Sequence, residues 1–499
     1  MRTTLALGFG LTFEELYRRD GLIRLDRAFM ERLKTGDPGL FNRLMAARAA
    51  PDALADRDES ELLIETAPHL EDFIGTLFGI GTELEALQTA HDSLAPLYRV
   101  KRLFVQRRAV KGVTAEQAAA LDGPALAAEL EALIGGSLTE IAFATHIELW
   151  TADEPSHAAE IDLALRYAQW ATLSEAGRAR HKAGLLFKVP HKLDPAHLVP
   201  VETETIDGVL MQRLAPTRWR RREGFGLTDQ GMDLAHGLDQ ANYCIWCHNQ
   251  GKDSCSKGLK DKDGGFKSSP FGVPLAGCPL EEKISEMNLV KARGHAVGAL
   301  AIVTIDNPMA AATGHRICND CMKSCIYQKQ EPVDIPQVET RNLKDVLDLP
   351  WGFEIYGLLT RWNPLNLRRP LPRPESGYKV LVVGLGPAGF TLAHHLMNDG
   401  HHVVAVDGLK IEPLEPAISG VSALGEAVPF RPIRDVTELY EHLGHRVMAG
   451  FGGVAEYGIT VRWNKNYLKL IRLLLERRRE FAMMGGVRFG GTITIDRAF

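Results

Sequence analysis

The spacing of hydrophobic residues predicts helices through the first third of the chain. One buried helix face is marked by five residues at intervals of three and four: Leu70, Phe73, Ile74, Leu77 and Phe78. A second helix is predicted from the capping-box spacing of Thr114 and Gln117 to Ile134, before a glycine pair. A third is expected to begin near Pro155. No chemical motif stands out here, and we expect a helical accessory domain over residues 1–185.

Prolines break this pattern in the next stretch. They stand at Pro190, Pro195, Pro200 and Pro216, so residues 186–235 are expected to form an irregular linker. The run 219–222, Trp-Arg-Arg-Arg, closes the linker. It is either a solvated face or a docking patch for an acidic electron-transfer partner.

The pattern changes again near residue 377, where short apolar runs flank a glycine-rich loop. Residues 380–383 and 403–406 read as buried strands on either side of a helix, which is typical of a βαβ start. The loop contains Gly384, Gly386, Pro387, Ala388 and Gly389, and the second strand ends at Asp407. In such motifs the glycines allow a tight turn and a close pyrophosphate, and the acid accepts hydrogen bonds from a ribose. These residues predict dinucleotide binding, without separating FAD from NAD.

Composition narrows the class of protein. The 499 residues are 45% hydrophobic and 24% charged, with a formal net charge of −5. This balance gives no electrostatic reason to expect nucleic acid or an anionic membrane as partner. No run reaches the roughly 18 apolar residues of a membrane span, and no signal-peptide cleavage site follows the start. We therefore expect a cytoplasmic protein in which disulfides are disfavoured and thiols are available to metals.

All seven cysteines lie within one short part of the chain, in the order C-x2-C-x7-C, a lone Cys-Pro and C-x2-C-x3-C. They are Cys244, Cys247, Cys255, Cys278, Cys318, Cys321 and Cys325. Such clustering is typical of metal ligands. A single zinc site on the two C-x2-C pairs would leave three cysteines idle, whereas two four-iron clusters would need one further ligand.

The order of these motifs resembles the N-terminal region of the glutamate synthase small subunit and of dihydropyrimidine dehydrogenase. The matching residues are the seven cysteines with Pro279-Leu280, Lys283-Ile284, Asn307-Pro308, Gly314, Arg316-Ile317 and Pro332-Val333-Asp334-Ile335. The likeness continues through the glycine loop to Gly452, Gly453 and Tyr457-Gly458-Ile459, and spans residues 236–499. It departs from the family in a much longer Cys255–Cys278 gap, a tighter Cys318–Cys321 gap, and Thr460 in place of a proline.

The resemblance implies FAD and two [4Fe-4S] clusters. It assigns one cluster to Cys244, Cys247, Cys255 and Cys325, and the other to Cys278, Cys318, Cys321 and Glu339. The alternative for Glu339 is an ordinary surface carboxylate. The resemblance places FAD on the glycine loop and along Gly452-Gly453. The inserted stretch 256–270 is expected to be a surface loop that leaves the cluster core intact.

These inferences combine into a multidomain fold class. We expect an α-helical N-terminal region over 1–185, a linker over 186–235, an α-helical iron–sulfur domain over 236–375 and an incomplete α/β Rossmann-type FAD-binding domain over 376–499. A helix is expected over 467–481 and a strand over 485–489, after which the domain is expected to be truncated.

The function expected from these inferences is an oxidoreductase passing electrons between NAD(P)H, FAD and [4Fe-4S] clusters to a redox partner. By resemblance, NAD(P)H binds a region that this chain lacks, so the partner is either another protein or a missing C-terminal portion. The alternative is a non-enzymatic iron–sulfur and nucleotide-binding scaffold, or an electron-relay subunit of a larger complex. No catalytic acid or base is identified.

Overall fold

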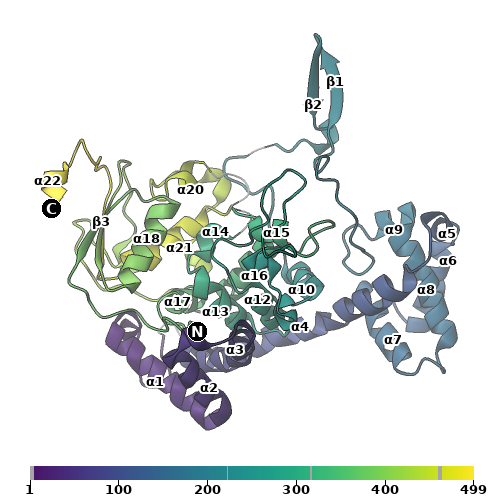
Figure 1. The fold of residues 1–499 in the computed structure, drawn as a ribbon, viewed down its shortest axis with the longest axis horizontal. Coiled ribbons are helices and arrows are strands. Elements are labelled where there is room, and N and C mark those ends of the chain that lie inside the picture. The colour runs from purple at the N-terminus through teal and green to yellow at the C-terminus, as the bar shows by residue number, and fades with distance from the viewer. Residues whose placement is uncertain (1–4, 222, 315–316, 459–462, 499) are drawn as a thin grey trace.

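The computed structural model describes residues 5–221, 223–314, 317–458 and 463–498. Its N-terminal helices form one side of the main body (Figure 1). They are η1 (Glu14–Tyr17), α1 (Arg19–Gly36), α2 (Pro38–Ala49), η2 (Pro51–Ala53) and α3 (Asp56–Phe78). The predicted buried face of α3 is confirmed, because Leu70, Phe73, Ile74 and Leu77 are fully buried. These helices share one hydrophobic core with residues as distant as Phe481.

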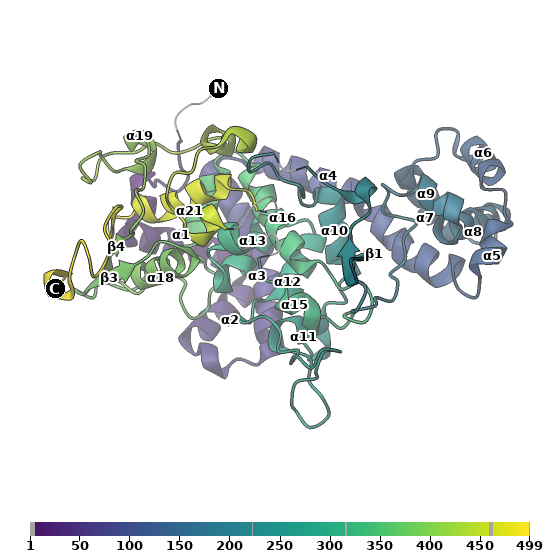
Figure 2. The ribbon, with the colours of Figure 1, turned by 90° about the horizontal axis from the view of Figure 1, so that it is seen from above.

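A long helical rod carries a second core away from this body (Figures 1 and 2). The rod is α4 (Gly81–Val100) continued by the π-helical η3 (Lys101–Ala109). The second core is built on the end of the rod, α6 (Gly123–Ile134), α7 (Glu140–Ala152) and α8 (Ala158–Leu173). Helices α5 (Ala115–Ala119) and α9 (Glu175–Arg180) pack on α8. The predicted 1–185 unit is thus divided between two cores.

The helix expected from Thr114 to Ile134 is two helices. Thr114 does form a capping box with Gln117, which confirms that start. Asp122 then caps a new helix by accepting a hydrogen bond from the Ala125 N–H at 3.1 Å. A second capping side chain inside the run explains the break, since it offers the backbone amides a fresh helix start.

The segment expected to be an irregular linker contains a β-hairpin. Strands β1 (Glu202–Ile206) and β2 (Val209–Arg213) pair antiparallel around an Asp207-Gly208 turn, followed by η4 (Pro216–Arg218). Both turn residues have positive φ, +51° and +77°, as a two-residue type I′ turn requires. The hairpin projects from the body (Figure 1).

The cysteine region is helical and packs in the middle of the main body (Figure 2). Its elements are α10 (Leu234–Tyr243), η5 (Cys247–Gln250), α11 (Ser254–Lys257), α12 (Ile284–Ala292), α13 (Ala296–Asp306), α14 (Ala310–Thr313), α15 (Asp320–Ser324), α16 (Ile335–Leu347) and α17 (Gly352–Leu359). Helix α13 is buried nearly all round and packs on α3, α12 and α16. Glu71 of α3 accepts a hydrogen bond from the Val297 N–H at 2.7 Å, which places an anion at the start of α13.

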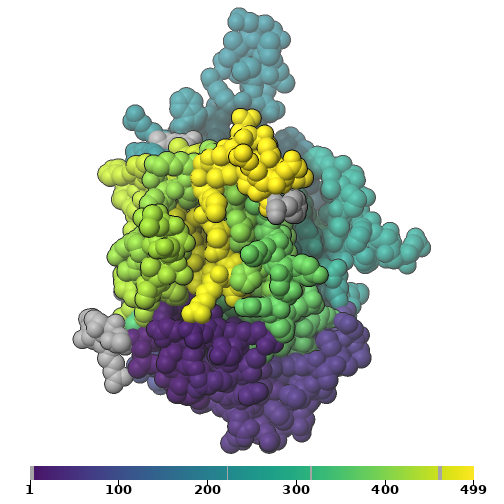
Figure 3. Space-filling model, turned by 90° about the vertical axis from the view of Figure 1, so that its left-hand side faces the viewer, coloured from purple at the N-terminus to yellow at the C-terminus, as the bar shows by residue number. Residues whose placement is uncertain are grey.

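A parallel three-stranded sheet in the order β3-β4-β5 forms the opposite end of the body. The elements are β3 (Lys379–Val383), α18 (Pro387–Asn398), β4 (His402–Val406), α19 (Pro416–Ser419), η6 (Val436–Leu439), η7 (Leu443–His445), α20 (Val454–Tyr457), α21 (Asn466–Glu476), β5 (Phe481–Met484) and α22 (Ile495–Ala498). Helix α18 packs on β3 and β4, and α21 packs on β5. The last residues run over the outside of this end (Figure 3).

The third strand of the sheet lies earlier than expected. The expectation of a helix to residue 481 and a strand over 485–489 is wrong, because α21 ends at Glu476 and β5 spans Phe481–Met484. Gly485 and Gly486 instead follow the strand, where Gly486 takes a positive φ of +72° and its N–H donates to the Leu409 carbonyl. The apolar Phe-Ala-Met-Met run fits the pairing with β4 better than the glycine-rich segment does.

Candidate functional site

Four buried thiols lie together where α10, η5, α11 and α15 meet. Cys244 follows α10, Cys247 begins η5, Cys255 lies in α11 and Cys325 ends α15. Trp246 turns the chain between the first two with a φ of +53°, and its N–H donates to Cys244 Sγ at 3.4 Å. This is the set that the resemblance assigns to one cluster.

Electrostatics shows that these thiols are close neighbours. Burial raises the pKa of Cys244 to about 12 and that of Cys247 to about 11. Burial is the main cause that raises the pKa of Cys255 well above its ordinary value. Ionisation of its neighbours Asp253, Cys244, Cys325 and Cys247 would raise that pKa further. A bound metal would therefore have to displace protons from buried thiols, because thiolate is the ligating form.

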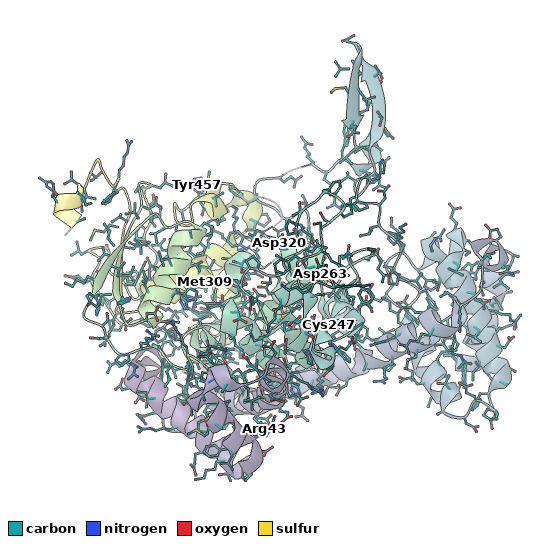
Figure 4. All side chains as sticks on the ribbon, in the orientation of Figure 1. Arg43, Cys247, Asp263, Met309, Asp320 and Tyr457 are labelled. Atoms are coloured by element: carbon teal, nitrogen blue, oxygen red, sulfur yellow. The ribbon has the colours of Figure 1, made fainter. Side chains whose placement is uncertain are left out.

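A second group contains Cys278, Cys318, Cys321 and Glu339. Burial raises the pKa of Cys321, and the next causes are the charges of Glu339, Cys278, Glu282 and Cys318. Cys318 is the one exposed thiol, with its Sγ 3.7 Å from Asp320 Oδ2. The two C-x2-C pairs thus have different neighbours, which disfavours a single zinc site on both. In Figure 4, Cys247 and Asp320 mark the two groups.

Glu339 is a buried residue of α16, so the surface-carboxylate alternative is wrong. Its exposed fraction is 6%, and Asn307 Nδ2 donates to its Oε1 at 2.6 Å. Burial, followed by the charge of Glu282, raises the pKa of Glu339 well above its ordinary value. Asn307 also donates to Thr313 Oγ1 at 2.5 Å, which ties the carboxylate to α14.

The long Cys255–Cys278 gap forms a projecting loop with a closed base. The Cys278 N–H donates to the Cys255 carbonyl at 2.9 Å and to the Ser256 carbonyl at 3.0 Å. Most residues over 260–274 are exposed, and the loop extends below α11 in Figure 2. The extra residues therefore return the chain to its starting point and leave the two cysteines adjacent.

The donor set fits iron–sulfur ligation, although the clusters themselves stay a prediction. All seven thiols, each in the described part of the chain, are free. Among the described residues, no three histidine, cysteine or acidic side chains converge closely enough for a single metal ion. A four-iron cluster bonds each thiolate to a different iron, so its ligands stand farther apart than those of one ion. A cavity of about 490 Å³ borders the first group at Cys247.

The glycine loop joins β3 to α18, and its backbone disfavours any residue larger than glycine at positions 384 and 389. Gly384 has a φ of +95°, and its N–H donates to the Val406 carbonyl at 2.8 Å. A Cβ on Gly389 would lie 1.8 Å from the Gly384 carbonyl oxygen, so the helix approaches the strand too closely for alanine. Pro387 and Ala388 form the first turn of α18. No side chain caps the start of α18, so the N–H groups that follow Pro387 in its first turn are available to an anion.

Gly386 lies beside the distant glycine pair. A Cβ on Gly453 would lie 2.9 Å from the Gly386 Cα, whereas a Cβ on Gly386 would meet nothing nearer than 3.8 Å. Gly452 and Gly453 have φ values of +110° and +52°. Protein packing alone therefore tolerates alanine at position 386, and the open space in front of it is what a pyrophosphate would use. The two segments that the resemblance assigns to one site therefore lie side by side.

Asp407 closes the loop at the end of β4. Its Oδ2 accepts from the Leu385 N–H and its Oδ1 from the Leu409 N–H, each at 2.9 Å. Each carboxylate oxygen keeps a further lone pair, which a ribose hydroxyl can use. A separate cavity of about 950 Å³ lies along β5, where Tyr17, Leu424 and Met484 contribute to its lining.

Sequence reasoning missed the aromatic cover of the first cysteine group. Tyr243 and Tyr327 stack with ring centroids 4.6 Å apart, and Gln330 Nε2 donates to the Tyr243 hydroxyl at 2.7 Å. The available signal was their place in the sequence, since each stands within two residues of Cys244 or Cys325. Two residues of the quoted motifs, Arg316 and Ile459, and also Thr460 and Arg222, lie outside the described residues.

Comparison with known proteins shows which family this chain belongs to. The family described as RP005 N-terminal alpha-helical domain matches residues 7–79. Protein RP005 of Rickettsia prowazekii (strain Madrid E) is 34% identical over 302 residues, which are 58% of this chain and 98% of RP005. The chain belongs to the RP005 family. That relation includes the N-terminal helices that share the main core with the cysteine region.

Other relatives are longer than the part that they share with this RP005-family chain. Protein RP006 of the same organism is 53% identical over 190 residues, 38% of this chain and 25% of RP006. The glutamate synthase [NADPH] small chain of Mycobacterium tuberculosis is 32% identical over 139 residues, 27% of this chain and 25% of that protein. The chain thus spans about a quarter of these two relatives. The partial likeness to the small chain supports a relation to oxidoreductases. Within the described residues, the helices are too short or too polar to traverse a bilayer.

Proposed function

We propose that this RP005-family protein is an iron–sulfur flavoprotein that carries electrons between a two-electron donor and a one-electron acceptor. The observation that carries the proposal is the sorting of the cysteines and Glu339 into two separate groups in the helical cysteine region, most of them buried. The partial likeness to the glutamate synthase small chain supports the same direction. When bound, FAD would exchange two electrons and [4Fe-4S] clusters one at a time.

The proposal assigns a role to each candidate site residue. Cys244, Cys247, Cys255 and Cys325 would hold one cluster, and Cys278, Cys318, Cys321 and Glu339 the other. Gly384–Gly389 and Gly452-Gly453 would hold the FAD pyrophosphate, and Asp407 its ribose. NAD(P)H as the donor, and a redox protein as the acceptor, belong to this proposal as well.

A short path of packed residues connects the second group to the glycine loop. Glu339 reaches α14 through Asn307 and Thr313, and Trp463 Nε1 donates to the Ala311 carbonyl of α14 at 3.0 Å. Trp463 is fully buried just before α21. The far end of this path is Leu468 of α21, which abuts Gly452. This arrangement favours the second group as the one nearer the proposed flavin.

The test is anaerobic purification with iron, sulfide and flavin counted per chain. We expect about eight iron and eight sulfide. Cys255→Ser and Cys321→Ser should each remove about half of the iron, and the double variant nearly all of it. Stoichiometric zinc without absorption near about 400 nm, or equal loss of all iron in both single variants of folded protein, would contradict the two-cluster assignment.

Glu339 offers a sharper test of one ligand. Glu339→Ala should leave the second cluster labile, so that about half of the iron is lost on gel filtration while the first cluster survives. Glu339→Gln is the matched control, because its amide oxygen can still accept from Asn307 and face a metal. If iron content and electron paramagnetic resonance spectra of Glu339→Ala match wild type, Glu339 is a structural acid.

A further inference from the structure

The β1–β2 hairpin is the most exposed ordered element of the molecule. All ten strand residues are exposed, including Val209 at 58%, Leu210 at 66% and Met211 at 47%. Figures 1 and 3 show it standing away from the body. A lone two-stranded hairpin is only marginally stable in water, and each of its free edges can pair with another strand.

The register identifies which backbone groups face outward. Ile206 and Val209 flank the two-residue turn and pair directly, as do Glu204 with Met211 and Glu202 with Arg213. In such a hairpin these pairs exchange the hydrogen bonds, and the intervening residues point their N–H and C=O groups away. The free edge of β2 is therefore formed by Leu210 and Gln212, and that of β1 by Thr203 and Thr205.

The charges distinguish the two edges. If two copies of β1 paired antiparallel about Glu204, two glutamates would lie opposite one another, which is destabilising. If two copies of β2 paired about Met211, the two Met211 side chains would meet and each Leu210 would lie opposite Gln212 of the other copy. Arg213 already pairs with Glu204 of its own hairpin at 2.7 Å, so its charge is compensated. The β2 edge can therefore pair with itself in a register that places no like charges opposite one another.

The same register brings the tip of each hairpin toward the basic segment at the base of the other. Continuing the antiparallel alignment past Met211 places Gly208 opposite Leu214, and Asp207 opposite Ala215, of the second copy. Arg218 stands three residues beyond that point and is exposed, with Arg220 and Arg221 after it. Asp207 of each hairpin thus lies three residues short of the other copy's Arg218 along the chain. Because the hairpins project, the two bodies lie at opposite ends of the new sheet and do not collide.

We propose that the hairpin is a dimerisation arm, and that two copies of this chain pair through β2 into a four-stranded antiparallel sheet with Met211 on the two-fold axis. The proposal pairs the outward N–H and C=O groups of Leu210 and Gln212, which have no partner strand in one copy. It is independent of the proposed electron-transfer function. Because a single strand pair buries little area, we expect association that depends on protein concentration.

The test compares proline on the two edges. Gln212→Pro removes an outward N–H from each copy of β2, while Thr203→Pro removes the equivalent outward N–H from β1. Neither N–H is used inside the hairpin. By sedimentation of the full chain, wild type and Thr203→Pro should dimerise alike, and Gln212→Pro should weaken the dimer about tenfold or more, since two hydrogen bonds are lost.

A second measurement locates the two-fold axis. Met211→Cys should crosslink two copies rapidly with a short bis-maleimide, whereas Glu204→Cys, on the same face of β1, should react no faster than wild type with its native thiols. A chain that stays monomeric up to its solubility limit would overturn the proposal. So would a dimer that Gln212→Pro leaves unchanged, or crosslinking at position 204 equal to that at position 211.

Discussion

The cysteine region and the glycine-loop region build their candidate sites in different ways. The ligands proposed for the clusters come from α10, η5, α11, α15 and α16 and from loops between them, and they meet only because α13 and its neighbours form a common core. The dinucleotide motif is nearly continuous from Gly384 to Asp407 and closes through local backbone contacts. A site of the first kind depends on the whole core, whereas a site of the second kind depends on a few close backbone approaches.

The two regions are nevertheless joined by a buried ion pair. Glu354 of α17 and Arg477, which follows α21, are 2.9 Å apart and almost fully buried, and the Tyr17 hydroxyl also donates to Glu354. Burial lowers the pKa of Arg477, but the charge of Glu354 and the hydrogen bonds with Glu354 and Tyr17 raise it more, so the guanidinium stays charged. The N-terminal helices, the cysteine region and the sheet are therefore expected to unfold together.

The largest expected effect on stability comes from removing the ion pair between Glu354 and Arg477. Glu354→Ala leaves Arg477 buried without its counter-ion and should lower the free energy of unfolding by about 3–5 kcal/mol. Asp52→Ala is the control, because Asp52 pairs with Arg368 on the surface and should change stability by less than about 1 kcal/mol. Urea denaturation of both variants measures the difference. Comparable values for the two variants would show that the regions are not coupled through this pair.

The next prediction separates packing from ligand binding within the glycine loop. Gly389→Ala should destabilise the sheet by about 1–3 kcal/mol, because its Cβ would overlap the Gly384 carbonyl oxygen. Gly386→Ala should keep wild-type stability, because its Cβ meets only ordinary contacts, yet it should lose FAD. Thermal unfolding and flavin content are measured on the same samples. Full flavin retention by folded Gly386→Ala would show that the pyrophosphate does not bind at this position.

The smallest expected effect is a dependence of stability on pH within the glycine-loop region. Burial in α18, followed by the charges of Arg478, His395 and Arg361, lowers the pKa of His394 well below its ordinary value. Below about pH 6.5, His394 is therefore protonated in the unfolded chain while it is still neutral in the folded chain. The contribution of His394 should fall by up to about 1.4 kcal/mol for each pH unit below about 6.5.

His394→Gln isolates the contribution of His394 to this pH dependence, because a neutral amide can still form a hydrogen bond with Asn398. Region-resolved hydrogen exchange at pH 7.5 and pH 5.5 should show β3, α18 and β4 losing protection at the lower pH in wild type and less so in the variant. Equal loss in both proteins would assign the acid sensitivity to other groups.

The sequence by itself determined those features that depend on neighbours in the chain. The α3 stripe, the Thr114 capping box and the βαβ start at the glycine loop all follow from spacing within about 25 residues, because helix faces, caps and tight turns are local. The position of β5 did not follow, since a strand in a parallel sheet is selected by its partner across the sheet.

Only the tertiary structure decided how distant segments meet. Spacing does not say that residues 11–80 share a core with the cysteines while residues 97–187 form another, because many apolar faces are interchangeable until they pack. Nor does it say that Glu339 is buried beside Cys321, or that Gly453 rests against Gly386. The inserted loop after Cys255 makes the same point. Its composition predicts a surface loop, but only the hydrogen bonds at its base show how the chain returns Cys278 to Cys255.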